Sequence, residues 1–209
     1  MKKLLIIAII SVLFLSCAPA KQVQQSAEDQ LTERNLDIAL GLAFTFTRQS
    51  GSASNQYAIW IENSEGRHVK TLYASRWTAN GGYSRRPASI PLWIKQSDRP
   101  NMTQAQVDAV SGATPATGDV AYLWDGTNYL GEIVPAGVYT LILEGTLRWE
   151  NQVYYRTPIT IELTSDESAI DQIVTGQTIV EYVGNGALAE RAMINDVHVG
   201  VLIISQDEE

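Results

Sequence analysis

The stretch from Val107 to Gly118 reads VDAVSGATPATG and holds small and polar residues without any aromatic or basic side chain. A threonine hydroxyl can carry an attached group only where its segment is open to other molecules. Around Thr114 the sequence favours such a segment, because Gly112 and Ala113 add little bulk and glycine permits unusual backbone shapes. Pro115 disfavours helix at Thr114 and favours an extended backbone. The stretch therefore predicts a presented hydroxyl that could carry a covalent group.

The same stretch also has a purely structural interpretation, which the sequence leaves open. Hydroxyl residues, glycine and proline are typical of turns, and a turn is needed before the strand that is expected near Asp119. In this interpretation Asp108 only ends or caps a short helix. The turn residues would be Ser111, Gly112, Thr114 and Pro115.

Arginine and aromatic residues near this stretch suggest a second kind of chemistry. Arginine binds phosphate through charge-assisted hydrogen bonds, and an indole can stack on a flat ligand ring. One interpretation is a noncovalent small-ligand site. The other is that Trp77 and Trp93 fold this segment onto a sheet, while Arg85 and Arg86 pair with acids. The residues concerned are Arg76, Trp77, Tyr83, Arg85, Arg86 and Trp93.

Two histidines, His68 and His198, lie in different expected strands, and the chain has a single cysteine. Their surroundings match no common zinc or metalloprotease spacing, and no GxSxG sequence marks a nucleophilic serine. The sequence thus predicts no catalytic residues and no metal ligands. The histidines are expected to face solvent or to lie on edge strands.

The elements that must position Thr114 are β-strands. From residue 37 to 47 apolar residues occupy every second position, as in a strand with one buried face. Similar runs recur along the chain, and the first three are expected to form a meander with a hairpin turn at residues 64–66. About eight strands without a long amphipathic helix predict an all-β, antiparallel β-sandwich. The expected strands are 37–47, 56–63, 67–77, 119–126, 137–149, 153–163, 177–183 and 196–205.

Residues 78–118 interrupt this pattern. Glycine, proline and asparagine follow one another closely, which favours one long irregular excursion from the sandwich. Connections longer than about 15 residues tend to be functional, disordered or locally structured. One short helix is expected to start at Thr103, with Gln106 in the capping-box position. Any function is therefore expected in this excursion.

The N-terminus has the composition of an export signal. Lys2 and Lys3 precede an apolar run from Leu4 to Leu15, which is too short to span a membrane and is typical of a secretory signal. The following LSCAPAK is similar to the lipidation site of bacterial lipoproteins, which implies that Cys17 is acylated; ordinary cleavage near CAPA is the alternative. The expected divisions are a lipoprotein signal at residues 1–16, an acylated tether at 17–34 and one β-sandwich domain at 35–209.

Charge limits the partners of this chain, whose formal charge is −8. Loss of residues 1–16 removes Lys2 and Lys3 and no acid, which leaves 13 basic and 23 acidic residues and a charge of −10. Nucleic acid and anionic lipid attract the opposite sign, so no nucleic-acid partner is expected. With one cysteine, the exported protein cannot form an internal disulfide.

Two resemblances sharpen these expectations. The segment YLWDGTNYLGEIVPAGVYTL, residues 122–141, is similar to the WDG and VPAGVY pattern of bacterial immunoglobulin-like modules, where it marks the fold rather than a site. Together with AIWIENSEGRHVKTLYASRW, RRPASIPLW and VDAVSGATP, it resembles a family of predicted periplasmic bacterial proteins, domain-of-unknown-function family 2271. The resemblance implies an exported immunoglobulin-like β-sandwich, often encoded near membrane redox proteins and flavin-attachment machinery, and assigns no activity.

The second resemblance is local. Residues 108–114, DAVSGAT, are similar to the DxxSGAT signature of proteins that carry FMN covalently. In those proteins a flavin transferase takes FMN from FAD and joins its phosphate to the final threonine. The resemblance implies that Thr114 is the attachment residue. Its recognition context would consist of Asp108, Ser111, Gly112 and Ala113.

We therefore expect an exported, membrane-anchored lipoprotein of the cell envelope that acts as a covalent FMN carrier or accessory protein in extracytosolic electron transfer. The flavin would do the chemistry and the protein would set its position, so a stand-alone enzyme is not expected. Its partners would be a flavin transferase and a membrane redox protein, with the membrane reached through the lipid anchor. The alternative is a structural or partner-binding immunoglobulin-like lipoprotein without a cofactor.

Overall fold

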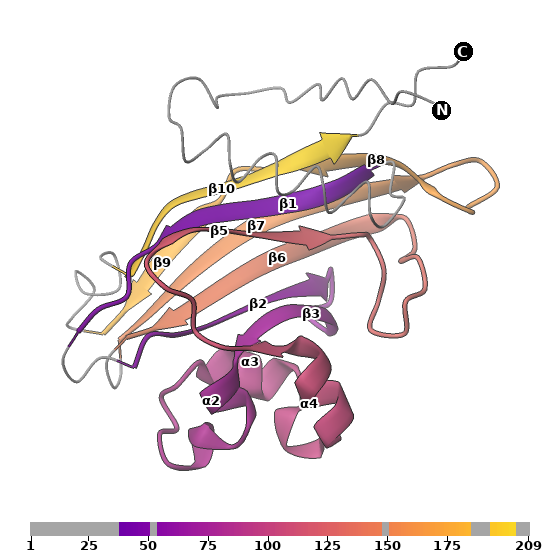
Figure 1. Cartoon of the computed structure of the whole chain (residues 1–209). Helices are drawn as coiled ribbons and strands as arrows, with labels where there is room; N and C mark the ends of the chain where they lie inside the picture. The colour runs from indigo at the N-terminus through magenta and orange to yellow at the C-terminus, as the bar shows by residue number, and fades with distance from the viewer. Residues whose placement is uncertain (1–37, 51–53, 148–150, 185–192, 204–209) are drawn as a thin grey trace, which may run out of the picture.

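The computed structural model describes residues 38–50, 54–147, 151–184 and 193–203 (Figure 1). The export signal, the lipidation of Cys17 and the tether lie outside the described residues and stay predictions. Within the described part of the chain, no helix is long and apolar enough to cross a membrane.

Two β-sheets face each other in this structure (Figure 1). The small sheet has the strand order β10-β1-β5, and the large sheet has the order β4-β3-β2-β6-β7-β8, with β9 also paired to β7. The small sheet contains β1 (Ile38–Phe46), β5 (Gly118–Trp124) and β10 (Ile194–Ile203). The large sheet contains β2 (Gln56–Asn63), β3 (His68–Ser75), β4 (Ser111–Gly112), β6 (Gly137–Thr146), β7 (Gln152–Leu163), β8 (Ile170–Thr175) and β9 (Ile179–Val183).

The alternation in β1 explains why the two sheets pack together. Leu40, Leu42, Phe44 and Phe46 are each at most 2% exposed, and they form one apolar cluster with side chains of the large sheet. Full burial of such a side chain contributes about 1.5 to 3 kcal/mol. All paired strands are antiparallel except β3 and β4. The predicted all-β sandwich is therefore confirmed.

The strand β2 is buried on both faces. Tyr57, Ile59 and Ile61 belong to the cluster between the two sheets. Ala58 and Trp60 belong to a second apolar cluster, on the opposite side of the large sheet. A strand with two buried faces needs a third layer to cover it.

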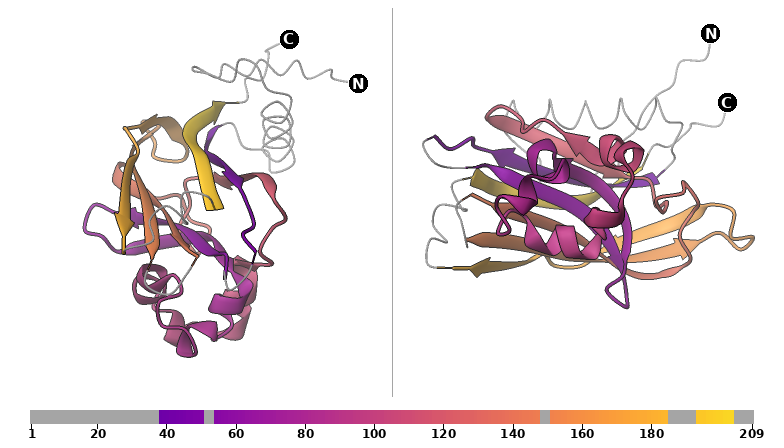
Figure 2. Two further views of the ribbon diagram at one scale, coloured as in Figure 1. Left: turned by 90° about the vertical axis from the view of Figure 1, so that its left-hand side faces the viewer. Right: turned by 90° about the horizontal axis from the view of Figure 1, so that it is seen from below.

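That third layer is a set of short helices between residues 76 and 110 (Figures 1 and 2). Ile90, Trp93 and Val107 from this helical layer are fully buried in the second cluster. The structure differs from the expected irregular excursion with one helix. The glycine and proline residues separate several short helices, and most of these have a buried side chain, such as Trp93 in α3 and Val107 in α4. The helices are α2 (Arg76–Ala79), η1 (Gly82–Ser84), α3 (Pro91–Gln96), η2 (Arg99–Asn101) and α4 (Gln104–Val110).

The helix α4 begins where the sequence predicts. The Thr103 hydroxyl accepts a hydrogen bond from the Gln106 backbone N–H at 3.3 Å, and Gln106 Oε1 accepts one from the Thr103 N–H at 2.8 Å. This capping box satisfies two backbone donors that the first helical turn leaves open. The prediction is confirmed, and α4 leads directly into the residues around Thr114.

Strand order differs from expectation in one respect. The strand β1 lies between β10 and β5, so the expected meander of the first three strands is wrong, and only β2 and β3 form the predicted hairpin. The chain changes sheets between Phe46 and Gln56. Alternation shows which face of a strand is buried and not which neighbour it has. The additional strand β8 has a single buried residue, Ile173, so it lacks the apolar alternation that marks the others.

Candidate functional site

The residues from 113 to 117, here called the crossing segment, connect the large sheet to the small sheet (Figure 1). Before them, β4 pairs with the end of β3 at Ala74 and Ser75. After them, Gly118 starts β5 opposite Phe46 of β1. The crossing segment therefore lies at the end of the sandwich where β1 finishes.

Thr114 is the second residue of the crossing segment and is partly exposed. Within the described ranges, no hydrogen bond involves its hydroxyl, whereas the Thr117 hydroxyl accepts the backbone N–H of Arg48 at 3.0 Å. Ala113 and Ala116 on either side are exposed. Thr114 is therefore a partly exposed hydroxyl residue between exposed alanines, without a hydrogen bond from its side chain in the described part of the chain.

Tyr73 of β3 fixes the start of the crossing segment. Its hydroxyl donates to the carbonyl oxygens of Gly112 at 3.2 Å and of Ala113 at 3.0 Å. A Cβ atom on Gly112 would lie 2.6 Å from the Tyr73 ring, so the ring leaves room only for glycine. Gly112 does not have a positive φ. The sequence-based argument from the backbone freedom of glycine is therefore wrong at this position, and the reason for glycine is steric.

A group of aromatic rings lies next to Tyr73 in the core. The Tyr57 ring stacks on the Tyr73 ring with centroids 4.6 Å apart, and the hydroxyls of Tyr57 and Tyr122 share a hydrogen bond. Burial raises the pKa of all three hydroxyls, and the neighbouring Tyr122 raises that of Tyr57 further. The three tyrosines are therefore neutral at physiological pH and serve as hydrogen-bonding and packing groups.

The structure brings only part of the DxxSGAT motif together. Ser111 and Gly112 run alongside β3 and lead straight to Thr114. Asp108 lies on α4, where its exposed carboxylate accepts a hydrogen bond from Gln104 Nε2 at 2.8 Å. The caps of α4 are Thr103 and Ser111, so the interpretation of Asp108 as a helix cap is wrong.

The arginine and aromatic residues of the helical layer lie in different surroundings. Trp93 is fully buried and donates its Nε1–H to Thr71 at 3.0 Å, as expected for a residue that folds this layer onto the sheet. Trp77 is 44% exposed, so the same expectation fails for it. The terminal guanidinium nitrogens of Arg86 are buried, and Arg85 is exposed.

Sequence interpretation missed two neighbours of the crossing segment, Tyr73 and Arg48. Tyr73 is 39 residues from Gly112 along the chain, and Arg48 is 69 residues from Thr117. The signal that would identify them is the pairing of β3 with β4 and of β1 with β5, which local patterns in one sequence do not carry.

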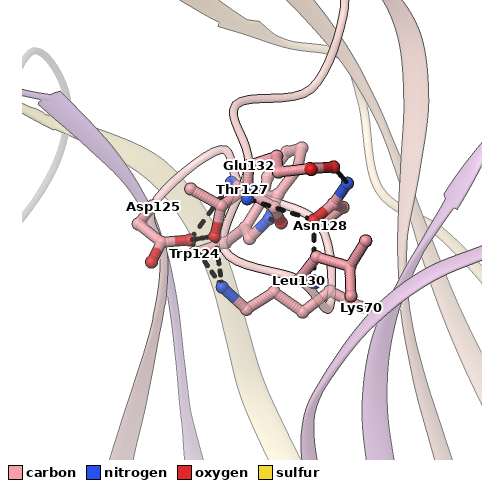
Figure 3. A network of polar contacts seen from close by, with 7 residues as sticks. All are labelled: Lys70, Trp124, Asp125, Thr127, Asn128, Leu130 and Glu132. Carbon is pink, nitrogen blue, oxygen red and sulfur yellow. Dashed lines mark hydrogen bonds and ion pairs between the residues drawn. The ribbon is translucent and has the colours of Figure 1, made fainter.

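The connection from β5 to β6, residues 125–136, has a different construction (Figure 3). Asp125 Oδ1 accepts hydrogen bonds from Lys70 Nζ at 2.9 Å and from the Thr127 hydroxyl at 2.7 Å. Burial raises the pKa of Asp125, but the bonds from Lys70 and Thr127 outweigh this effect and lower it below its usual value. The WDG residues therefore build a charged anchor at the start of the loop.

The tip of this loop is held by Asn128 (Figure 3). Its Oδ1 accepts the backbone N–H groups of Leu130 at 2.8 Å and Glu132 at 3.1 Å. Gly126 has a φ of 67°, and a Cβ atom there would lie 1.9 Å from Ile170 Cδ1. These contacts hold the loop together.

The two histidines lie on different sheets, His68 on β3 and His198 on β10. His198 is exposed on an edge strand, as expected. His68 is partly buried, its Nε2 lies 2.8 Å from the Thr71 hydroxyl, and burial lowers its pKa to about 4. Over the described ranges, no three acid, histidine or cysteine side chains are arranged to hold a metal ion.

Comparisons with known proteins give one match, to a protein family. Neither the curated proteins nor the solved structures include a match. One family model, described as "Predicted periplasmic protein (DUF2271)", matches residues 40–181, which run from β1 into β9 and include the crossing segment. The description supports an extracytoplasmic location. Because the match covers more than half of the chain, this protein belongs to the DUF2271 family of predicted periplasmic proteins.

Proposed function

We propose that this protein carries FMN covalently on Thr114 and takes part in electron transfer outside the cytoplasm, held to the membrane through a lipidated Cys17. The observation that carries the proposal is the hydroxyl of Thr114, which lacks a hydrogen bond within the described residues although its segment is anchored at both ends. The periplasmic description of the family is consistent with this location.

The attachment is a transfer of one phosphoryl group. A flavin transferase would break the P–O–P bond of FAD, form a bond between Thr114 Oγ1 and the FMN phosphorus, and release AMP. The hydroxyl proton would pass to a base on the transferase. Asp108, Ser111, Gly112 and Ala113 would be the residues that the transferase recognises.

The chain's own residues would position the attached group. Tyr73 fixes the backbone at Gly112 and Ala113 through its hydroxyl, and its ring stacks on Tyr57 in the core. The exposed Ala113 and Ala116 leave space around the Thr114 side chain. When bound, the isoalloxazine ring supplies the electron-carrying chemistry.

Mass spectrometry of the protein co-expressed with a flavin transferase tests this proposal. The wild type should gain one FMN on the peptide that contains Thr114, and Thr114→Val should gain none. The matched control is Thr160→Val, which removes a partly exposed hydroxyl on β7, away from the crossing segment, and should leave attachment intact. An unmodified Thr114 peptide, under conditions that modify a known acceptor, contradicts the proposal.

A second candidate is a structural or partner-binding lipoprotein without a cofactor. One observation favours it: the contact with the Tyr73 ring accounts for Gly112 without any transferase. This candidate predicts a colourless protein from the native host. The FMN proposal predicts flavin absorbance that remains after denaturation.

A further inference from the structure

We propose that Arg76 and Arg48 bind the phosphate group that links the flavin to Thr114 and thereby fix the cofactor on the protein. The inference rests on the proposed function and adds residues that the DxxSGAT resemblance does not assign. Both arginines are exposed. Within the described ranges, neither takes part in an ion pair.

The position of Arg76 follows from the pairing of β3 with β4. Ser75 of β3 is paired with Gly112 of β4, so Arg76 and Ala113 are the residues that directly follow these two paired strands. Burial raises the pKa of Tyr73, and the charge of Arg76 opposes this rise. The guanidinium therefore lies within electrostatic range of the Tyr73 hydroxyl, which itself is bonded to the Ala113 carbonyl oxygen. This places a positive charge on the large-sheet side of Thr114.

Arg48 lies on the other side of the crossing segment. It follows β1, and its backbone N–H donates to the Thr117 hydroxyl at 3.0 Å. Arg76 and Arg48, which are distant in sequence, thus lie next to the two ends of the five-residue crossing segment that contains Thr114. Both side chains are exposed, in a protein with more acidic than basic residues. The nearby acid Asp119 is exposed and accepts a hydrogen bond from Thr45 at 2.8 Å.

The chemistry of the link suits this arrangement. A phosphate joined to both threonine and the ribityl chain is a diester, with a single negative charge shared by two free oxygens. A planar guanidinium presents parallel N–H groups that match two such oxygens. Three other basic residues of the described ranges are less suited, because Lys70 and Arg156 are paired with carboxylates and the Arg86 nitrogens are buried.

Binding of free flavins to the unmodified full chain tests the inference. Flavin fluorescence anisotropy would be measured with FMN and with riboflavin, which lacks the phosphate. FMN should bind more tightly than riboflavin. Arg76→Ala should weaken FMN binding by about fivefold, the upper end for exposed charge pairs. Adding Arg48→Ala to this variant should weaken FMN binding further. The matched control Arg85→Ala removes an exposed arginine of the helical layer and should change nothing.

The outcomes separate this inference from the proposed function. The inference is overturned if FMN binds no better than riboflavin, or if Arg76→Ala and Arg85→Ala give the same FMN affinity. Salt should reduce the preference for FMN, since the contact is electrostatic. Attachment is scored separately by mass spectrometry, so a protein that prefers FMN through Arg76 but is never modified at Thr114 contradicts the proposed function alone.

Discussion

The two segments that flank β5 contrast in how they are held. The loop at residues 125–136 is organised by its own side chains, with Asp125 and Asn128 as the centres of two hydrogen-bond networks. The crossing segment at residues 113–117 is held from outside, by Tyr73 at one end and the Arg48 backbone at the other. Within the described residues, Thr114 between these two anchors makes no side-chain hydrogen bond, whereas Asp125 and Asn128 use their side chains to hold the loop.

The largest expected effect on stability concerns the loop at residues 125–136. Gly126→Ala should destabilise the protein by about 4 kcal/mol, because it adds a left-handed backbone penalty and a clash with Ile170. Thermal unfolding would measure this loss. Gly131→Ala in the same loop has a φ of 81° but no atom near its Cβ position, so it should cost only about 1 kcal/mol. Equal losses for the two variants would show that the Ile170 contact is not important.

A second effect concerns the helical layer that leads into the crossing segment. The buried Glu144 carboxylate accepts the backbone N–H groups of Leu92 at 3.1 Å and Trp93 at 2.8 Å, and burial raises its pKa from 4.5 to about 7. The folded state therefore holds this proton more tightly than the unfolded state does. Stability from this group is complete below pH 4.5 and is lost as the pH rises through about 7, by about 3 kcal/mol.

The substitution Glu144→Gln keeps one carbonyl acceptor and removes the titration. Urea unfolding at several pH values should therefore show a flatter stability profile for the variant between pH 4.5 and about 7. Hydrogen exchange of α3 amides should follow the same trend, while the 125–136 loop should not respond to Glu144. A variant profile as steep as that of the wild type would assign the pH dependence to other groups.

A third, smaller effect concerns the entry to the crossing segment. Gly112→Ala should destabilise the protein by about 2 kcal/mol, because the Tyr73 ring must move to admit a methyl group. Unlike Gly126, Gly112 has no positive φ, so only the steric part of the penalty applies. Chemical denaturation would measure it, with Ser111→Ala as the neighbouring control. A neutral Gly112→Ala would mean that the ring has room to shift.

The smallest effect tests the anchor itself. Tyr73→Phe keeps the ring and removes the hydrogen bonds to two carbonyl groups, which should cost about 1 kcal/mol. Amide exchange should increase at residues 113–117 and stay unchanged at residues 125–136, because the two segments share no contact through Tyr73. Faster exchange in both segments would contradict the distinction drawn between them.

Local patterns identified much of this fold. Alternation placed β1, β2 and β5 within one or two residues, because a strand with one buried face has a period of two wherever it pairs. The same patterns could not show that β1 pairs with β5 and not β2, since the pairing depends on residues about 80 positions apart. The helices of this layer other than α4 were missed for a related reason, because contacts such as that of Trp93 with Thr71 hold them and they are too short to show a periodicity of their own.

For the candidate site, too, the sequence indicated only features that depend on nearby residues. The sequence indicated Thr114 as a presented hydroxyl and the start of α4 at Thr103, both of which depend on nearby residues. It gave no indication of Tyr73, although that ring determines why position 112 is glycine. Residues that shape a site from another strand become visible only once the pairing of strands is known.

The direction of β1 has a consequence for how such a protein would be suspended. Ile38, where the described chain begins, is paired with the end of β10 and lies near Trp124, whereas the other end of β1 meets the start of β5 beside the crossing segment. Nine strand residues span about 30 Å. Under the proposed lipid attachment on the N-terminal side, Thr114 would therefore lie at the end of the sandwich opposite to the attached end.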